Sequence, residues 1–454
     1  MRRARRLPIL PVIALAASIA CAGDDGGATS ATTGLSGAGL SGAATATTTG
    51  TISTGSTGAG SGAATGQDAS GGEATGQDMS GGGDTSGDTT GAGDTTGLSG
   101  DTSGGDDTTT GGIDEPPPQK EVIFTRPMQG GASDLAIEAK LNALIGDALP
   151  GSSIRVALYH WSRVGVANEL VAAKAKGVDV KVILDGSNDN KAVDALKAGL
   201  GAGNVVLCGG EGGGCIGDGI NHNKLFLFSA LADGSKDVVV QSSANLVLSQ
   251  TRKHNNMVVI RDDAALYAAY AEYWDDLHAQ KTNLNYYTSA NGDTDTKVYF
   301  YPRASGDTIV SVLGNVECTP GTIRVAMAFF TDARVAIAAK LVELKEAGCD
   351  VAVILRDEDG YPGDDVLATL KAGKVGVTLY PEGPNAEGLH SKYLLIHSRY
   401  AGVDDRRVLW TGSHNYTGTA LHSNDETLLR IEDGAIFDAF VADWIEMKSL
   451  AGTF

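Results

Sequence analysis

The chain carries one sequence plan twice, and this internal repeat limits its fold more than any other feature. SIRVALYHWS (153–162) recurs as TIRVAMAFFT (322–331), and GVDVKVILDG (177–186) recurs as GCDVAVILRD (348–357). A helical stretch separates the two apolar runs of each copy, and strand, helix and strand in that order predict a parallel βαβ unit. A repeat of about 170 residues is too long for a solenoid, so we expect two homologous α/β domains in the 454-residue chain.

The repeat extends to single residues, with offsets of 168 to 170 positions between the copies. Each copy also ends in three aromatic residues with i, i+3 and i+7 spacing, which predicts that a closing helix packs onto each sheet. The matched residues are Arg155 and Arg324, His222 and His390, Lys224 and Lys392, Asn245 and Asn415, and the trios Tyr267, Tyr270, Trp274 and Phe437, Phe440, Trp444.

Both copies place a His-x-Lys on an apolar strand, within NHNKLFLFS (221–229) and GLHSKYLLIHS (388–398). Because side chains on a strand alternate between its faces, the histidine and the lysine of each pair point the same way. One such pair could be a polar patch at a sheet edge, but two at matching places indicate function, because burying two lysines has no structural purpose. Each copy adds a Ser-x-Asn about twenty residues later, Ser243 with Asn245 and Ser413 with Asn415.

If the two domains bring these strands together, the resulting cluster suits phosphoryl transfer. Lysine ammonium and asparagine amide groups can offset the negative charge that grows on the non-bridging oxygens of a phosphoryl group. One neutral imidazole can attack phosphorus while the other, protonated, gives its proton to the leaving alkoxide. Since Lys224 and Lys392 supply the positive charge, we expect no metal and no cofactor.

At these residues the chain resembles the phospholipase D superfamily, which is marked by a duplicated H-x-K-x4-D followed by G/S-S-x-N. The resemblance covers residues 120–454. It implies two α/β/α lobes, 120–290 and 291–454, packed as a pseudodimer with one shared active site. It also implies catalytic roles for His222, Lys224, Asn245, His390, Lys392 and Asn415, with Ser243 and Ser413 beside the site as substrate-binding residues.

The chain departs from the family pattern at two kinds of position. Ser229 and His397 stand where the motif has aspartate, but strand alternation turns both away from the histidine and lysine. Family members also hold each histidine with a downstream carboxylate, which the second copy offers as Asp425 and Glu426, whereas the first has Asn255 and Asn256. We therefore expect Glu426 to support a more basic His390 and Asn256 to orient His222. The resemblance implies that the first-copy histidine, His222, is the nucleophile, which leaves His390 as the general acid.

The N-terminal quarter of the chain predicts targeting rather than folded structure. Residues 1–21 carry four arginines, an apolar stretch too short to span a bilayer, and Cys21 where bacterial lipoprotein signals place their acylated cysteine. The alternative is ordinary cleavage near Ala20. Residues 22–119 are almost wholly Gly, Ser, Thr, Ala and Asp and predict a disordered tether. We expect an extracytoplasmic monomer, anchored to a bacterial membrane through lipidated Cys21 or otherwise secreted.

Four cysteines remain in this oxidising setting, which permits disulfides. Cys208 and Cys215 bracket the glycine-rich stretch CGGEGGGC and predict a pair, whereas Cys349 is either a small core residue or bridged to Cys318. The glycine-rich loop 209–219 lacks the Lys-Ser/Thr of a P-loop and is interpreted as a flexible lid. Zinc is disfavoured because the histidines do not have the spacing of a ligand set; they are His222, His254, His390, His397 and His414.

Three functions are compatible with the sequence. The first is a phosphodiesterase of the phospholipase D type that hydrolyses or transphosphatidylates phospholipids. The second is an extracellular nuclease of the same superfamily, which is disfavoured because the chain has a net charge of −20 and its folded part is also acidic. The third is a degenerate member that binds phosphate-bearing ligands without turnover, suggested by Ser229, His397 and Asn256.

Overall fold

The computed structural model describes residues 118–127, 132–210, 212–358, 360–382 and 388–451. The predicted signal with Cys21, and all but the last two residues of the predicted tether, lie outside the described residues. Within the described part, no helix is long and apolar enough to cross a membrane.

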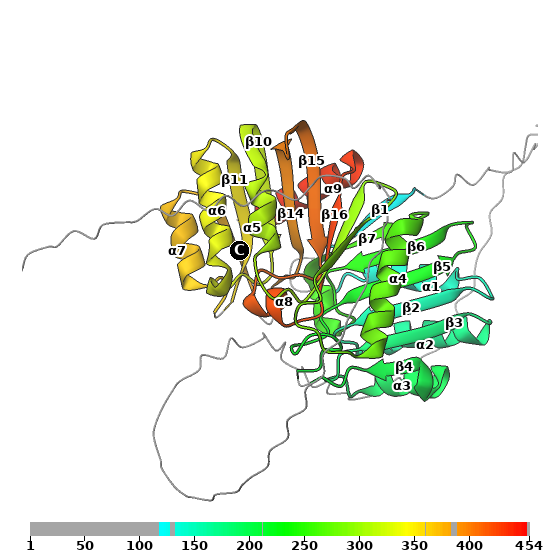
Figure 1. Cartoon of the computed structure of the whole chain (residues 1–454). Coiled ribbons are helices and arrows are strands. Elements are labelled where there is room, and N and C mark those ends of the chain that lie inside the picture. The colour runs from blue at the N-terminus through cyan, green and yellow to red at the C-terminus, as the bar shows by residue number, and fades with distance from the viewer. Residues whose placement is uncertain (1–117, 128–131, 211, 359, 383–387, 452–454) are drawn as a thin grey trace, which may run out of the picture. The chain divides into compact units, whose positions relative to one another are not determined.

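The first copy contributes seven strands, drawn from cyan to green in Figure 1, to a mixed sheet of eight; the eighth strand, β13, comes from the second copy. Its order is β1-β7-β6-β5-β2-β3-β4; β2, β3 and β4 run parallel, and the other strands on this path are antiparallel to their neighbours. Helices α2 and α3 connect the parallel strands, which confirms the predicted βαβ units. The bounds are β1 Lys120–Thr125, α1 Ala136–Gly146, β2 Ser153–Leu158, α2 Val164–Ala175, β3 Asp179–Leu184, α3 Lys191–Leu200, β4 Val205–Leu207, β5 Lys224–Ala230, β6 Lys236–Ser242, β7 Lys253–Ile260 and α4 Ala264–Ala279.

The second copy repeats this plan in a second eight-stranded sheet with the order β12-β11-β10-β14-β15-β16-β9-β8. The predicted boundary between residues 290 and 291 falls inside β8, which belongs to this second sheet. The bounds are β8 Thr288–Asn291, β9 Thr296–Phe300, α5 Thr308–Gly314, β10 Val316–Met327, α6 Val335–Glu346, β11 Asp350–Asp357, α7 Asp364–Ala372, β12 Gly376–Pro381, β13 Gly388–Leu389, β14 Lys392–Tyr400, β15 Val403–Gly412, α8 Gly418–His422, β16 Thr427–Ile431 and α9 Gly434–Ala451, and short 3-10 turns cover Ala202–Asn204, Leu248–Arg252 and Asp332–Arg334.

Each sheet is covered by helices on both faces, as the resemblance implied. Helices α1, α2 and α3 share an apolar core with one face of the first sheet, and α5, α6 and α7 do the same for the second sheet. The remaining faces of both sheets share a single apolar core with α4 and α9 (Figure 1). The chain therefore forms two α/β/α lobes joined by a common core.

The closing helices α4 and α9 are fixed by the aromatic residues that the sequence singled out. Trp274 of α4 donates its indole N–H to the carbonyl of Val156 at 2.9 Å, and Trp444 of α9 donates to the carbonyl of Val325 at 3.0 Å. Both indoles are buried, because each offers a large apolar surface with one donor that finds a partner. The predicted packing of a helix onto each sheet is confirmed.

The lobes also exchange backbone contacts. Strand β13, from the second copy, pairs in parallel with β7 of the first sheet, with Gly388 opposite Lys253 and Leu389 opposite His254. On the other side, Asn221 of the first copy forms a parallel bridge with Asp425 of the second. The segments that lead into the two His-x-Lys motifs are therefore each held by the opposite lobe.

Candidate active site

The two histidines of the His-x-Lys motifs lie where the lobes meet. The backbone N–H of His222 donates to the carbonyl of Asp425 at 3.0 Å, and the backbone N–H of His390 donates to the carbonyl of His254 at 2.9 Å. Each histidine stands just before a buried strand, β5 or β14, that begins at its lysine. The structure thus brings both motifs to one interface, with each histidine anchored to the main chain of the other lobe.

His222 is oriented by a carboxylate from the second lobe. Its Nδ1 lies 2.8 Å from Oε1 and 3.0 Å from Oε2 of Glu426. Glu426 is fully buried, and it also accepts hydrogen bonds from the Ser413 hydroxyl at 2.5 Å and the Asn424 amide at 3.3 Å. Burial raises the pKa of Glu426 to about 8, against the opposing effect of Lys224 and of these hydrogen bonds. The prediction that Glu426 supports His390 is wrong, because this carboxylate reaches across the interface to His222.

His390 is oriented by a neutral side chain from the first lobe. Its Nδ1 lies 3.0 Å from the amide oxygen of Asn255. The Asn255 amide nitrogen donates to the carbonyls of Gln250 and Lys253 at 3.1 and 3.2 Å, so its oxygen is turned to accept. Nδ1 of His390 is therefore the protonated ring nitrogen in the neutral state, and Nε2 is left for chemistry.

Asn256, predicted to orient His222, instead donates to the Thr411 hydroxyl at 2.8 Å. The reason is a register change of one residue: the Ser243 N–H donates to the carbonyl of Asn256, whereas the Ser413 N–H donates to that of Thr427. Asn255 is thus the counterpart of Glu426, at an offset of 171. Aligning the apolar ends MVVI (257–260) and LLRI (428–431) gives this offset from the sequence alone.

Ser243 and Ser413 support the two orienting residues. The Ser243 hydroxyl donates to the amide oxygen of Asn255 at 3.1 Å, as the Ser413 hydroxyl does to Glu426. Asn245 and Asn415 follow two residues later and are buried; no described residue provides a hydrogen-bond partner for Oδ1 of Asn415. The structure places each Ser-x-Asn turn beside the histidine and orienting residue that it supports.

The two lysines are buried to a degree that is rare for this residue type, with 0% exposure for Lys224 and 2% for Lys392. Each Nζ donates to the carbonyl of its own histidine, at 2.8 Å in the first motif and 2.7 Å in the second. Nζ of Lys392 also lies 3.2 and 3.4 Å from the two ring nitrogens of His390. Both ammonium groups are therefore held beside the histidines.

Two further cations, Lys253 of the first lobe and Arg356 of the second, act on His390. Nζ of Lys253 and Nε of Arg356 lie 2.8 and 3.0 Å from the two oxygens of Glu382. The Arg356 guanidinium lies 4.6 Å from the centre of the Phe329 ring, whose edge faces His390. Burial, followed by Lys392, Lys253, Lys224 and Arg356, lowers the pKa of His390 well below its usual value. The His390 ring is therefore neutral at neutral pH in this structure.

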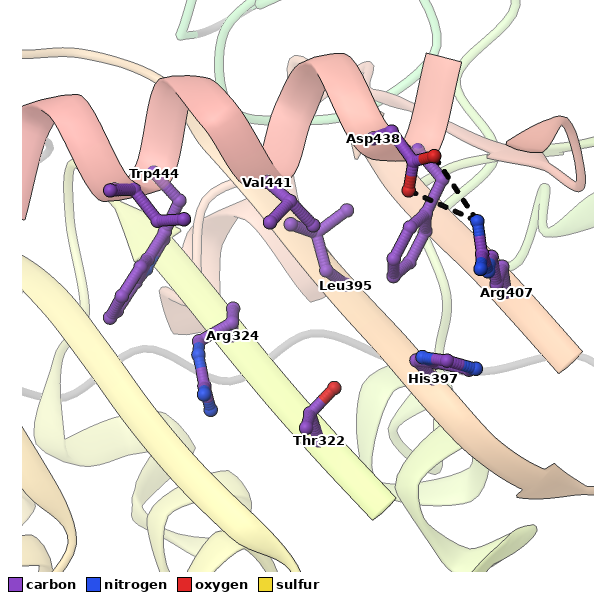
Figure 2. A pocket seen from close by; sticks show the side chains of 10 residues that line it. Thr322, Arg324, Leu395, His397, Arg407, Asp438, Val441 and Trp444 are labelled. Carbon is purple, nitrogen blue, oxygen red and sulfur yellow. Dashed lines mark hydrogen bonds and ion pairs between the residues drawn. The ribbon is translucent and has the colours of Figure 1, made fainter. Parts of the chain in front are cut away.

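Ser229 and His397, at the motif-aspartate positions, do not take part in this site. The Ser229 hydroxyl accepts the N–H of Ser153 at 2.8 Å, and Nε2 of His397 lies 2.6 Å from Asp405. His397 lines a cavity of about 290 Å³ between α9 and the second sheet, together with Arg324, Arg407 and Trp444 (Figure 2). Lys392 lies on the opposite face of β14, as strand alternation predicts.

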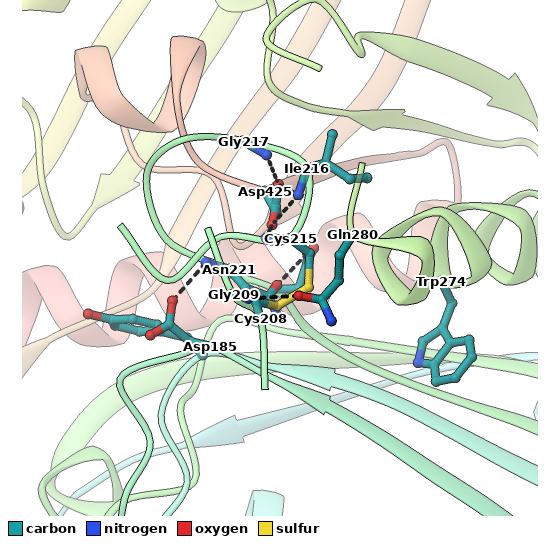
Figure 3. The surroundings of a disulfide bond; sticks show 12 residues. Asp185, Cys208, Gly209, Cys215, Ile216, Gly217, Asn221, Trp274, Gln280 and Asp425 are labelled. Atoms are coloured by element: carbon teal, nitrogen blue, oxygen red, sulfur yellow. Dashed lines mark hydrogen bonds between the residues drawn. A yellow bond between two sulfur atoms is a disulfide. The ribbon is translucent and has the colours of Figure 1, made fainter. Parts of the chain in front are cut away.

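The structure contains both disulfides that the sequence allowed. Cys208 pairs with Cys215 as predicted, and Cys318 pairs with Cys349, which decides between the two interpretations of Cys349. The interpretation of loop 209–219 as a flexible lid is wrong for its described residues. Cys215 and Ile216 are buried, and their N–H groups bind the Asp425 carboxylate (Figure 3).

Sequence reasoning missed Asp185 and the role of Asp425, two buried acids that hold the segments around His222. Asp185, at the end of β3, accepts the backbone N–H of Asn221 at 2.9 Å, and burial raises its pKa. Asp425 holds the glycine-rich loop. Such anchors leave no pattern in the sequence, because the groups that bind these carboxylates are backbone N–H groups and not particular side chains.

The other histidines serve the fold. Nε2 of His254 lies 2.9 Å from the Tyr380 hydroxyl, and burial lowers the pKa of His254 to about 4. His414 is buried against the ring of Tyr301, and burial lowers its pKa well below the usual value. Across the described ranges, no three His, Cys, Asp or Glu side chains are grouped so as to hold a metal ion. A metal-independent mechanism stays a prediction.

A comparison with protein families identifies the fold. Residues 141–278 and 317–447 match the family described as "Cardiolipin synthase, PLD-like domain". The two stretches fall one on each copy of the repeat and together make up more than half of the chain. This chain belongs to the PLD-like domain family. Its two lobes are a duplicated PLD-like domain of the phospholipase D superfamily, whose members are typically phosphodiesterases.

Individual relatives are distant. A phospholipase D of Rickettsia bellii (strain RML369-C) is 25% identical over 116 residues, which make up 26% of this chain and 52% of that protein. This chain thus spans about half the length of that curated relative. Among solved structures, phosphatidylserine synthase of Haemophilus influenzae Rd KW20 has a TM-score of 0.49 and 18% identity, over 72% of this chain and 86% of that one.

Two further structures match with lower TM-scores. Nuc from Salmonella typhimurium, a phospholipase D family member, has a TM-score of 0.27 and 24% identity, over 34% of this chain and 92% of that one. Polyphosphate kinase from Porphyromonas gingivalis has a TM-score of 0.48 and 12% identity, over 71% of this chain and 46% of that one. Likenesses at this distance do not assign a substrate to the PLD-like site.

Proposed function

We propose that this protein is a phosphodiesterase of the phospholipase D type, which hydrolyses or transphosphatidylates phospholipids through a phosphohistidine. The observation that carries the proposal is the cross-lobe pairing of His222 with Glu426 and of His390 with Asn255, each beside a buried lysine. A fold gains nothing from burying two lysines beside two histidines, whereas a phosphoryl group supplies the negative charge that makes the arrangement favourable.

In the first step, Nε2 of His222 attacks phosphorus and the bond from phosphorus to the leaving alkoxide breaks. The His222 ring gains positive charge as the phosphorus–nitrogen bond forms, and the Glu426 carboxylate at Nδ1 offsets this charge. Lys224 and Lys392 offset the charge on the non-bridging oxygens, together with the amides of Asn245 and Asn415.

His390 gives its Nε2 proton to the leaving alkoxide in the first step. In the second step, water or an alcohol attacks phosphorus, the phosphorus–nitrogen bond to His222 breaks, and Nε2 of His390 takes the proton of the attacking hydroxyl. A bound phosphodiester anion favours the protonated ring and opposes the burial and the cations that lower the pKa of His390. Asn255 is neutral and cannot offset a lasting charge on His390. A transient proton therefore suits His390, and the longer-lived phosphohistidine suits His222.

The choice of phospholipid rests on the acidic character of the chain and on the distant relative named phospholipase D. A net charge of −20 opposes association with nucleic acid, whose binding depends on lysine and arginine contacts with phosphates. In this proposal, lipidated Cys21 and the tether of residues 22–119 would hold the enzyme at a bacterial membrane.

The test uses the full chain, with head-group release from mixed phospholipid vesicles measured beside cleavage of plasmid and single-stranded DNA, all in EDTA. Head-group release that is lost in His222→Ala and His390→Ala supports the proposal. DNA cleavage without lipid turnover identifies a nuclease. If the chain has neither activity, and His390→Ala leaves phosphate-ligand binding unchanged, the enzyme proposal fails.

A further inference from the structure

We infer that Asp425 is a positioning residue that holds Glu426 against His222 for catalysis. Its carboxylate is bound by backbone N–H groups of the loop that the Cys208–Cys215 disulfide closes. The inference deepens the proposed function and rests on it for the reaction. It concerns residues that touch neither the substrate nor the reacting atoms.

The Asp425 carboxylate is fully buried and is bound by three consecutive backbone N–H groups of the other lobe (Figure 3). Oδ2 accepts from Cys215 at 2.6 Å, and Oδ1 accepts from Ile216 at 3.1 Å and from Gly217 at 2.6 Å. Successive amides that converge on one carboxylate form an anion-binding nest. Burial raises the pKa of Asp425 to about 7, and the three amides oppose this shift.

The same second-lobe segment is bonded along its length to the residues that lead into His222. Gly219 donates its N–H to the carbonyl of Ser423 at 2.9 Å, and the N–H of Asp425 donates to the carbonyl of Ile220 at 2.9 Å. The carbonyl of Asp425 then accepts the His222 N–H at 3.0 Å. Asp425 therefore holds the loop with its side chain and His222 with its main chain, and the next residue, Glu426, reaches the His222 ring.

This approach depends on glycine in the loop. A Cβ at Gly217 would lie 1.8 Å from the carbonyl oxygen of Ser423, and one at Gly219 would lie 2.3 Å from the Asn424 side chain. The glycine-rich composition, first interpreted as a sign of flexibility, is explained by close packing of backbone against backbone.

The Cys208–Cys215 disulfide fixes the other end of the nest. Cys208 follows β4, and its N–H donates to the carbonyl of Leu184 at 2.9 Å, so it is tied to the first sheet. The disulfide joins Cys215, the first donor of the nest, to this anchored residue. The Gln280 side chain adds a bond of 2.7 Å to the N–H of Gly209. A continuous series of bonds thus links the first sheet to Glu426. It runs from Cys208 through the disulfide to Cys215, and from the Cys215 N–H to Asp425, the residue before Glu426.

The main chain of His390 is held by a different anchor, His254 of the first lobe. His254 stands where Asp425 stands, since its carbonyl accepts the N–H of His390. Its side chain bonds the Tyr380 hydroxyl on β12 at 2.9 Å, which is a neutral contact with no disulfide. Among the described residues, the nest of backbone amides lies beside His222, the proposed nucleophile, and His390 has the Tyr380–His254 contact in its place, as expected if His222 needs the tighter placement.

The experiment compares Asp425→Asn and the double variant Cys208→Ser/Cys215→Ser with a matched control, Cys318→Ser/Cys349→Ser, in the full chain. The control removes the other disulfide, which closes a longer loop in the second lobe. Measurements are kcat, KM, the pH profile of kcat, the midpoint of thermal unfolding, and the ¹⁵N NMR signals of His222.

We expect Asp425→Asn and the Cys208/Cys215 variant to lower kcat by about 10- to 100-fold, the usual effect of losing a partner behind a reactive group, with KM nearly unchanged and the pH profile shifted. The control should lower the unfolding midpoint and leave kcat and the pH profile as in the native chain. The inference is overturned if Asp425→Asn keeps native kcat and pH dependence, or if kcat falls equally in the control.

The NMR measurement separates this inference from the proposed function. Native Nδ1 of His222 should show a proton shared with Glu426, and this signal should change in Asp425→Asn whether or not lipid is turned over. If the native chain has no activity, the proposed function fails and the NMR signals alone decide the inference. Should the double cysteine variant not fold, Asp425→Asn, which preserves shape, gives the result.

Discussion

Replacing Glu426 by glutamine isolates the charge behind His222. The Ser413 hydroxyl donates to Oε2 of Glu426 at 2.5 Å and the Asn424 amide donates to Oε1 at 3.3 Å. Glutamine with its single side-chain oxygen at the Oε2 position keeps the Ser413 bond and gives up the longer Asn424 bond. Its NH₂ group then faces Nδ1 of His222 and donates to it. The ring proton is forced onto Nε2, the nitrogen that attacks phosphorus.

Two losses add up in Glu426→Gln. A hydrogen bond to a charged group is worth about 1 to 2 kcal/mol more than a neutral one, or roughly 5- to 30-fold in rate. The wrong tautomer adds a further loss, and misplacing a proton in general acid–base catalysis costs about 10²- to 10⁴-fold. We expect kcat to fall by about 10³- to 10⁵-fold, equivalent to about 4 to 7 kcal/mol in the barrier.

The fold should not suffer from this substitution. Burial raises the pKa of Glu426 to about 8, which means that the ionised carboxylate is costly inside the protein, and glutamine removes that cost. The assay is pre-steady-state release of head group with trapping of the phosphohistidine, together with thermal unfolding at pH 8. A kcat within about threefold of the native value, or a phosphate label on His390 of the native chain, would refute the reasoning.

Other predictions concern His390, Asp443 and the disulfides. Asn255→Asp places a carboxylate at Nδ1 of His390, which should raise the low pKa of this histidine by about 1 to 3 units. The pH at which kcat/KM declines as pH rises should then move upward. A decline at the same pH as in the native chain contradicts the assignment of His390 as the general acid. Arg356→Met removes one of the cations that lower the pKa of His390, and should shift the same decline in the same direction by a smaller amount. Burial raises the pKa of Asp443 from 3.8 to about 7, so the native state binds a proton that the unfolded chain has lost, and stability should fall as pH rises from about 4 to 7. Asp443→Asn should flatten this slope and stabilise the protein at pH 8 by about 1 to 4 kcal/mol in denaturant unfolding. An unchanged slope would exclude Asp443 as its source. Removing the Cys318–Cys349 disulfide, with a sequence separation of 31, should lower the unfolding free energy by about 4 kcal/mol, against about 2.5 kcal/mol for Cys208–Cys215 with a separation of 7. We expect the opposite order for kcat, with the larger loss on removal of Cys208–Cys215. The same order in stability and in kcat would contradict the role given to Cys208–Cys215.

Much of the fold could be predicted because its signals are periodic and repeated. The βαβ units, the closing helices with Trp274 and Trp444, and the pairing of Cys208 with Cys215 all follow from local patterns that the chain shows twice or at close range. The two His-x-Lys motifs indicated a joint site for the same reason. A duplicated pattern predicts which residues correspond, and corresponding residues come together when two similar lobes pack face to face.

The partners of the histidines could not be predicted in the same way. Glu426 lies 36 residues after His390 and 204 after His222, yet it binds the more distant one. The reason is that β13 pairs with the sheet of the first lobe and an isolated bridge joins Asn221 to Asp425 across the interface. The single-residue shift that makes Asn255 its counterpart was legible in the apolar ends of β7 and β16. The role of Asp425 was not legible, because a carboxylate bound by backbone amides leaves no complementary side chain in the sequence.

The crossed pairing of histidines and orienting residues has a consequence for how this site can change over evolutionary time. A lobe exchanged for that of a relative would bring its own histidine but would impose its orienting residue on the histidine of the other lobe. The chemical role of each histidine therefore depends on both copies. His222 is encoded in the first copy, whereas the carboxylate that orients it, Glu426, is encoded in the second. A substitution that looks local to one copy changes the chemistry of the other, which lets a duplicated pair of identical half-sites become two different ones with one change on each side.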